Sequence, residues 1–157
     1  MANTMRWRYG DTNPVRLPVA SDTEIEIGDL VYLEAGEAKP ASAQADQGTS
    51  LLNLHAFHDA FVGVAMQASP AGQESAIRIA TTGVFEFDCD AAAHELGDLL
   101  SVGVAPSGDE LFDQQVAAGA TIDSALGRCA KQQPDATPRV LIDIVSTVAR
   151  GGPQPVA

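Results

Sequence analysis

Apolar and polar residues alternate over the central part of this chain, which is the pattern of strands with one buried face. Residues 61–87 read FVGVAMQASPAGQESAIRIATTGVFEF. Turn-forming residues interrupt the alternation at 69–72 and again at 81–83. The stretch therefore predicts an antiparallel pair of strands followed by a third strand, with the glycines and the proline at the turns.

Shorter runs of the same kind precede this stretch. Residues 15–19, 24–27 and 30–33 carry alternating or continuous apolar side chains, and a Gly-Asp step separates the last two runs. The segment 34–48 is polar and rich in alanine, so we expect a loop there. Together these runs predict an all-β, mainly antiparallel domain.

Two parts of the chain resemble each other. The segment FVGVA (61–65) is similar to LGRCA (126–130) when their glycines are aligned, and IGDL (27–30) is similar to LGDL (96–99). Two matches in the same order favour an internal duplication. The alternative is that small β proteins reuse Gly-Asp turns and V-G-V strands independently.

We expect repeat units of about 15–83 and 84–148, which together form one duplicated β domain, with a flexible tail at 149–157. The glycines at equivalent positions should lie at strand corners or where two backbones come close, because glycine has no Cβ. These expected corners are Gly28, Gly63, Gly97 and Gly127.

A short helix is predicted over Ser50–Ala60. Leu51, Leu54 and Phe57 recur with the helical period and should face inward, and Thr49 or Ser50 can cap the first turn.

His55 and His58 on this helix, beside Asp59, are the most enzyme-like feature of the sequence. Histidines three apart share roughly one helix face, so a metal site is conceivable. However, no third ligand follows at motif spacing and no HExxH pattern occurs, so we favour a structural role without a metal. The chain also lacks a G-x-S-x-G elbow, a P-loop and a calcium loop, and we expect neither an enzyme nor a cofactor.

Residues 1–14 show no periodicity and predict an extended N-terminal arm. Trp7 and Tyr9 alternate there with Arg6 and Arg8, which would place the aromatic rings on one face of a strand and the arginines on the other. Exposed rings of this size are costly unless a partner covers them. The alternative is a first strand that folds back on the chain's own sheet.

The charge of the protein limits its partners. The 157 residues carry a net charge of -12, whereas nucleic-acid binding needs clustered basic residues. No segment has the length or apolar character of a signal peptide core or a membrane span, so we expect neither export by a standard signal nor a membrane partner. Cys89 and Cys129 fit no zinc spacing and are expected as buried apolar residues whose redox state is open.

The order of these segments resembles the decoration proteins, also called cement proteins, of tailed-bacteriophage capsids. The resemblance lies in an N-terminal arm followed by IEIGDLV (25–31), FVGVA (61–65), IRIATTGVF (77–85) and ELGDL (95–99). These are structural turns and strands, so the resemblance transfers no catalytic residue to this chain.

The resemblance implies a small β-barrel or β-tulip-like domain that assembles as a homo-oligomer, a trimer, on the outer surface of a phage head. There it binds the major capsid protein and stabilises contacts between capsid subunits. Compared with the shorter members of that family, this chain has an insertion at residues 41–59. The arm would supply the capsid-binding residues Arg6, Trp7, Arg8, Tyr9 and Arg16. A viral fibre, a carbohydrate-binding β module and a small metal-dependent enzyme remain alternative functions.

Overall fold

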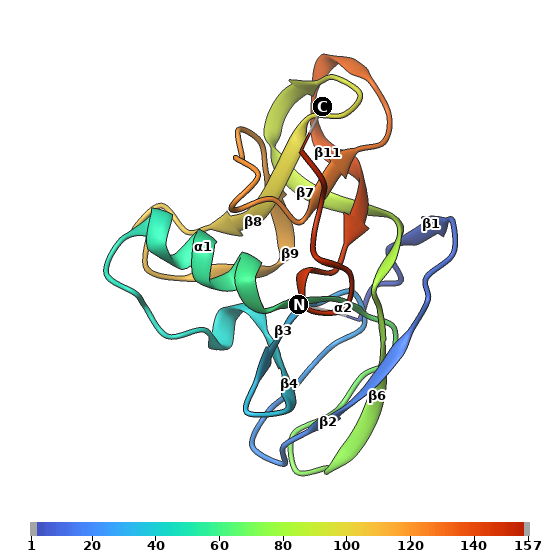
Figure 1. Cartoon of the computed structure of the whole chain (residues 1–157), viewed down its shortest axis with the longest axis vertical. Helices are drawn as coiled ribbons and strands as arrows, with labels where there is room; N and C mark the ends of the chain where they lie inside the picture. Colours follow the sequence, from blue (N-terminus) through green and yellow to red (C-terminus); the bar gives the residue numbers. More distant parts are fainter. Residues whose placement is uncertain (1–2, 156–157) are drawn as a thin grey trace.

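The computed structural model describes residues 3–155, and within this range the chain forms two β-sheets (Figure 1). The all-β prediction is confirmed. The strands are β1 (Trp7–Tyr9), β2 (Val15–Val19), β3 (Leu30–Glu34), β4 (Glu37–Pro40), β5 (Phe61–Ala65), β6 (Ser75–Ala80), β7 (Thr82–His94), β8 (Leu99–Val104), β9 (Leu111–Ala117), β10 (Gly127–Cys129) and β11 (Gln133–Val145). The helices are the 3-10 helix η1 (Ala41–Ala43), α1 (Ser50–Ala60) and α2 (Thr147–Arg150). In this part of the chain, no helix is long and apolar enough to cross a bilayer.

The two sheets have the same strand order. Sheet A runs β1-β7-β11-β10-β8-β9 and sheet B runs β2-β6-β5-β3-β4. When β1 is left aside, each sheet places its strands in the order first, fifth, fourth, second, third along the chain, with antiparallel neighbours. Sheet A also curls until β7 and β9 pair in parallel at Asp88 and Gln115. The barrel or tulip shape remains a prediction.

The Gly-Asp turns before β3 and β8 have the same internal geometry. In the first turn the Asp29 carboxylate accepts a bond of 2.9 Å from the N–H of Glu26, and in the second the Asp98 carboxylate accepts one of 2.9 Å from the N–H of Glu95. Each carboxylate thereby closes its own turn, as short acidic side chains do.

The turn glycines also have equivalent neighbours. Gly28 has a φ of +99° and donates its N–H to Ala65, while Gly97 has a φ of +91° and donates to Cys129. Both acceptors lie two residues after a strand glycine, Gly63 or Gly127. The turns therefore need glycine for its backbone conformation.

Gly63 and Gly127 occupy the same register in the two sheets. Gly63 pairs with Val31 of β3, and Gly127 pairs with Leu100 of β8. On its other side each glycine lies against the last strand of its unit, which is β6 for Gly63 and β11 for Gly127, and the backbone of that strand comes very close to the glycine. The boundary between the repeat units at residues 83 and 84 stays a prediction.

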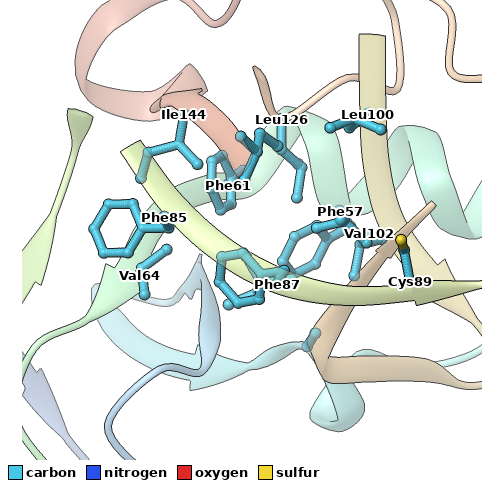
Figure 2. Close-up of a cluster of buried hydrophobic side chains, with 14 of the residues drawn as sticks. Phe57, Phe61, Val64, Phe85, Phe87, Cys89, Leu100, Val102, Leu126 and Ile144 are labelled. Atoms are coloured by element: carbon cyan, nitrogen blue, oxygen red, sulfur yellow. The ribbon is translucent and has the colours of Figure 1, made fainter. Parts of the chain in front are cut away.

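The main core lies between the sheets and helix α1. Figure 2 shows aromatic and aliphatic side chains from α1, β5, β7 and β8 pointing toward one another. Its largest fully buried members are Phe57, Phe61, Phe85, Phe87, Leu30, Leu100, Leu126, Ile142 and Ile144. A second cluster fills the other face of sheet B and contains Val19, Ile25, Val31, Ala38, Val62, Ala65, Ile77 and Ile79.

The predicted helix Ser50–Ala60 is present with these bounds, and Thr49 caps it by accepting from the N–H of Leu52 at 3.2 Å. Phe57 is fully buried, as expected, and Leu54 packs against the core. Leu51 is 57% exposed, so its predicted inward position is wrong. The first turn of the helix instead buries Asn53.

The buried position in the first turn holds a polar residue because the Asn53 side chain forms hydrogen bonds to two loops. Its side-chain oxygen accepts from the N–H of Gln47 at 2.6 Å, and its amide nitrogen donates to Asp46 and to the carbonyl of Gly108, both at 3.0 Å. A buried amide with these partners is satisfied, whereas a leucine there would remove the partner of the Gln47 N–H and of the Gly108 carbonyl, while Asp46 would keep the N–H of Gly48.

Three further expectations differ from the structure. The predicted loop 34–48 contains strand β4 and helix η1, because Ala35 and Gly36 adopt positive φ angles of 52° and 81° and form a tight hairpin turn. The expected single helix is joined by α2, which Ser146 caps and Gly151 ends with a φ of 84°. Of the expected flexible tail 149–157, Gly152 and Pro153 are buried, while residues 156 and 157 lie outside the described range.

Candidate interaction surface

The segment expected as an N-terminal arm is docked on the body. Strand β1 pairs antiparallel with β7, with Trp7 opposite Phe85 and Tyr9 opposite Val84, and a bulge lies between the two pairs. It forms one edge of sheet A (Figure 1). From residue 3 onward the chain therefore follows the alternative interpretation, a first strand on its own sheet; residues 1 and 2 lie outside the described part.

Arg6 fixes this strand from its inner face. The residue is only 7% exposed, and its Nε donates to the side-chain oxygen of Gln114 at 2.9 Å. Its Nη2 lies 3.5 Å from Asp88, and its guanidinium stands over the ring of Phe87 at 5.3 Å. Burial lowers the pKa of Arg6, and the charge of Asp88 acts in the opposite direction. Arg6 is thus occupied within the chain, which separates it from the residues that a partner could reach.

Gln114 connects the arm to the first Gly-Asp turn. Its amide nitrogen donates to Asp29 at 2.9 Å and to the carbonyl of Ile27 at 3.2 Å. Asp29 is 3% exposed, and this burial raises its pKa from 3.8 to about 6, although hydrogen bonds from Glu26 and Gln114 act to lower it. The hydrogen bonds from Arg6 to Gln114 and from Gln114 to Asp29 therefore connect the segment at β1 to strand β9 and to the turn before β3 of sheet B.

The raised pKa of Asp29 predicts a pH-dependent stability. A carboxyl group whose pKa is raised on folding stabilises the protein fully below its unfolded value, near pH 4, and this contribution is lost as the pH rises through about 6. Two pKa units correspond to about 3 kcal/mol of unfolding free energy. The Asp29→Asn variant should lack this loss, so the unfolding free energy of wild type relative to the variant should fall by about 2–3 kcal/mol between pH 4 and pH 7. Urea unfolding at each pH measures this difference.

The second Gly-Asp turn supplies the control. Asp98→Asn changes the same position of the same turn, but Asp98 is exposed, so the burial that raises the pKa of Asp29 is missing. A wild-type minus Asp29→Asn difference that changes with pH no more than the wild-type minus Asp98→Asn difference would contradict the assignment.

Three large apolar side chains of the docked segment are exposed. Met5 is 49% exposed, Trp7 is 40% and Tyr9 is 52%. Trp7 donates its indole N–H to the carbonyl of Gly10 at 3.0 Å, and this bond fixes the ring while leaving much of it accessible. Arg8 pairs with Glu86 at 3.2 Å on the same strand pair. The docked segment therefore exposes the side chains of Met5, Trp7 and Tyr9 beside the ion pair of Arg8 with Glu86.

Arg16, the remaining expected binding residue, does not join this group through any contact of the structure. It lies in β2, an edge strand of sheet B, where it donates to the carbonyl of Ala76 at 3.4 Å. Arg6, Trp7, Arg8 and Tyr9 belong to sheet A instead. A role in partner binding stays a prediction for all five residues.

The residues of the alternative metal site, His55, His58 and Asp59, lie on helix α1. Among residues 3–155, no group of three or more His, Cys, Asp or Glu side chains is arranged to hold a metal. His58 donates its Nδ1 to the carbonyl of Ala125 at 2.7 Å, which ties α1 to the segment before β10, and Asp59 is exposed. Cys89 and Cys129 are unpaired and buried, and burial raises the pKa of both thiols.

No sequence pattern indicates that Gln114 and Asp29 form a hydrogen-bonded pair. Asp29 belongs to the recognised Gly-Asp corner, but Gln114 lies in a polar strand with nothing to distinguish it from the adjacent Gln115. Only the structure shows that one glutamine is 2% exposed and bonded to both an arginine and a carboxylate.

Comparisons with known proteins give little further information. No protein-family model matches the chain, and no curated protein sequence matches it. Among solved structures, the N base of the head fiber gp8.5 from bacteriophage phi29 aligns over 83% of this chain and 93% of that chain, with a TM-score of 0.49 and 11% sequence identity. A similarity of this size does not assign a function.

Proposed function

We propose that this chain is a structural protein of a tailed-phage head, a decoration protein that binds the outer surface of the capsid and stabilises contacts between major capsid subunits. It acts as a homotrimer and not as an enzyme. The resemblance of its turns and strands to capsid decoration proteins motivates the proposal, and the exposed surface of strand β1 carries it.

Strand β1 has the properties of a protein-binding edge. Within the described residues it pairs only with β7, and an added strand would replace the Arg8 guanidinium, which donates to the carbonyls of Met5 and Trp7 at 3.1 Å and 3.3 Å. The exposed Trp7 and Tyr9 can bury large apolar areas with little loss of side-chain entropy, and such aromatic residues dominate many interfaces. The net charge of -12 keeps the remaining surface solvated.

Cosedimentation with undecorated heads of the parent phage tests this proposal. The double variant Trp7→Ala/Tyr9→Ala should bind at least about thirtyfold more weakly, since truncating one aromatic anchor commonly costs about 2 kcal/mol. Leu51→Ala/Leu52→Ala is the matched control, because it removes two side chains that are 57% and 50% exposed on helix α1. Circular dichroism checks that both variants fold. Equal binding of the β1 variant and wild type would contradict the proposal.

A carbohydrate-binding module is the second candidate. If Trp7 and Tyr9 were part of a free arm, a carbohydrate-binding module would be disfavoured. In the structure both rings lie on the folded body, where a sugar could stack on them. Quenching of the fluorescence of Trp7, the one tryptophan of the chain, by a panel of bacterial surface glycans tests it. Saturable quenching, together with unchanged head binding by the β1 double variant, would favour this second function.

A further inference from the structure

The first Gly-Asp turn is covered by the N-terminal segment. The N–H of Ile27 donates to the side-chain oxygen of Asn3 at 2.8 Å, and the carbonyl of Ile27 accepts from the N–H of Thr4 at 2.9 Å. A Cβ on Gly28 would meet the carbonyl oxygen of Thr4. Two consecutive arm residues thus satisfy both polar groups of the residue at the tip of this turn.

The second Gly-Asp turn has the same geometry but no cover. Leu96 takes the place of Ile27, and no hydrogen bond between residues 3–155 reaches its N–H or its carbonyl. Its side chain is 72% exposed, and a Cβ on Gly97 would meet nothing within 4 Å. The second turn therefore has the geometry of the first, but the hydrogen-bonding groups that Asn3 and Thr4 occupy at the first turn are accessible here.

The open turn is held in place from below. Arg128 donates to the carbonyl of Gly97 and to the carbonyl of Gln154, both at 2.8 Å, and the N–H of Gly97 donates to Cys129 at 2.9 Å. The polar groups of Leu96 are thus presented by a fixed backbone, which lowers the entropic cost of binding to them.

The charge around the open turn favours a basic ligand. Glu95 and Asp98 are exposed on the turn itself, and residues 86–113 contain eight acidic residues and no Lys or Arg. The segment on the first turn continues into Arg6 and Arg8. Complementary charge of this kind raises association rates and selects among partners.

We infer that the turn at Leu96 is a docking site for an extended, basic segment of a partner protein. An Asn or Asp side chain of that segment accepts from the N–H of Leu96, and the next backbone N–H donates to its carbonyl, as Asn3 and Thr4 do at Ile27. A partner protein is favoured over a second copy's arm, because that arm would have to leave its own contacts between Arg6 and Gln114. The inference does not depend on capsid binding by strand β1.

A peptide of residues 2–9, ANTMRWRY, with blocked ends is the probe. In the full-length protein the first turn is already occupied, so titration followed by amide chemical shifts should perturb Leu96 and Gly97 in a saturable way. The same peptide with Asn3→Ala should bind about fivefold more weakly, as expected for one lost hydrogen bond. Leu96→Lys should weaken binding about tenfold through charge repulsion and lost apolar contact. Leu51→Lys, at a comparably exposed leucine, should leave binding unchanged.

Three results would overturn the inference. The first is chemical-shift changes centred on Phe85 and Glu86, which would show that the peptide exchanges with the protein's own β1. The second is the absence of a saturable shift at Leu96 and Gly97. The third is equal binding of the peptide by Leu96→Lys and by wild type. Concentration-dependent self-association that Leu96→Lys abolishes would identify the occupant as a second copy and would reject the partner protein.

Discussion

Replacing Gly63 or Gly127 by alanine is expected to prevent stable folding. A Cβ on Gly63 would overlap the carbonyl oxygen of Ala80, and a Cβ on Gly127 would overlap that of Asp143. These oxygens belong to the backbones of neighbouring strands, which cannot move without breaking the ladder of their sheet. Each variant should lose more than about 4 kcal/mol of unfolding free energy, or fail to accumulate as soluble protein.

Gly36→Ala is the control for these two variants. Gly36 lies in the hairpin turn before β4 with a φ of +81°, and a Cβ there would meet nothing within 4 Å. Its cost should be limited to backbone strain, about 1 kcal/mol. Urea unfolding compares the three variants. A loss at Gly63 or Gly127 no larger than the loss at Gly36 would contradict the close approach, and a large loss at only one of the pair would contradict the structural equivalence of the two sheets.

Replacing Gln114 by leucine should produce the second large effect. The variant removes the acceptor of the Arg6 Nε–H and the donor to the Asp29 carboxylate, and both partners are buried. Arg6 keeps Asp88 and Asp29 keeps the N–H of Glu26, but each buried charge loses one hydrogen bond, and a hydrogen bond to a charged group contributes about 1.5–3 kcal/mol. The loss should release strand β1 as well as destabilise the domain, so hydrogen exchange of the amides from Thr4 to Tyr9 should accelerate.

Gln115→Leu is a matched control, because Gln115 is the adjacent residue of β9 and is only partly buried. We expect it to change the unfolding free energy by at most about 0.5 kcal/mol. If both glutamine variants lose the same stability, or if the amides of β1 keep their protection in Gln114→Leu, Gln114 does not hold the strand.

The same network changes the expected effect of deleting the N-terminal segment. For a free arm, removing residues 2–13 would leave the body folded and test partner binding alone. In the structure, Thr12 accepts from the N–H groups of Thr81 and Thr82, and Arg6 is buried between sheets. A deletion would therefore destabilise the domain, and point substitutions on the outer face of β1 are the appropriate test.

Elements with a strong local pattern could be predicted from the sequence. The alternation around Ile77, Ile79 and Phe85 identified β6 and β7, and the leucine and phenylalanine spacing identified α1. Strand β4 was missed because Glu37–Pro40 contains alanine and proline, which are uncommon in strands, and is specified by the turn before it. The helical spacing predicts Leu51 as buried, but the first turn of α1 extends past the core, so Leu51 is exposed although it has the same spacing as Leu54 and Phe57.

Contacts between distant residues could not be predicted. Arg6 and Gln114 are 108 positions apart, and Gln114 and Asp29 are 85 apart. No local pattern relates them, since their meeting depends on how β9 and the first turn are placed by the two sheets. The docking of β1 follows from the same contacts, so the sequence left a free arm and a first strand as open alternatives.

Capsid binding through strand β1 is tested most directly by a cryo-EM reconstruction of heads carrying the protein. We predict density for groups of three copies on the outer capsid surface, with Trp7 and Tyr9 of each copy buried against a major capsid subunit. Density that leaves both rings in solvent, or a head surface that binds no copy at all, would contradict the account.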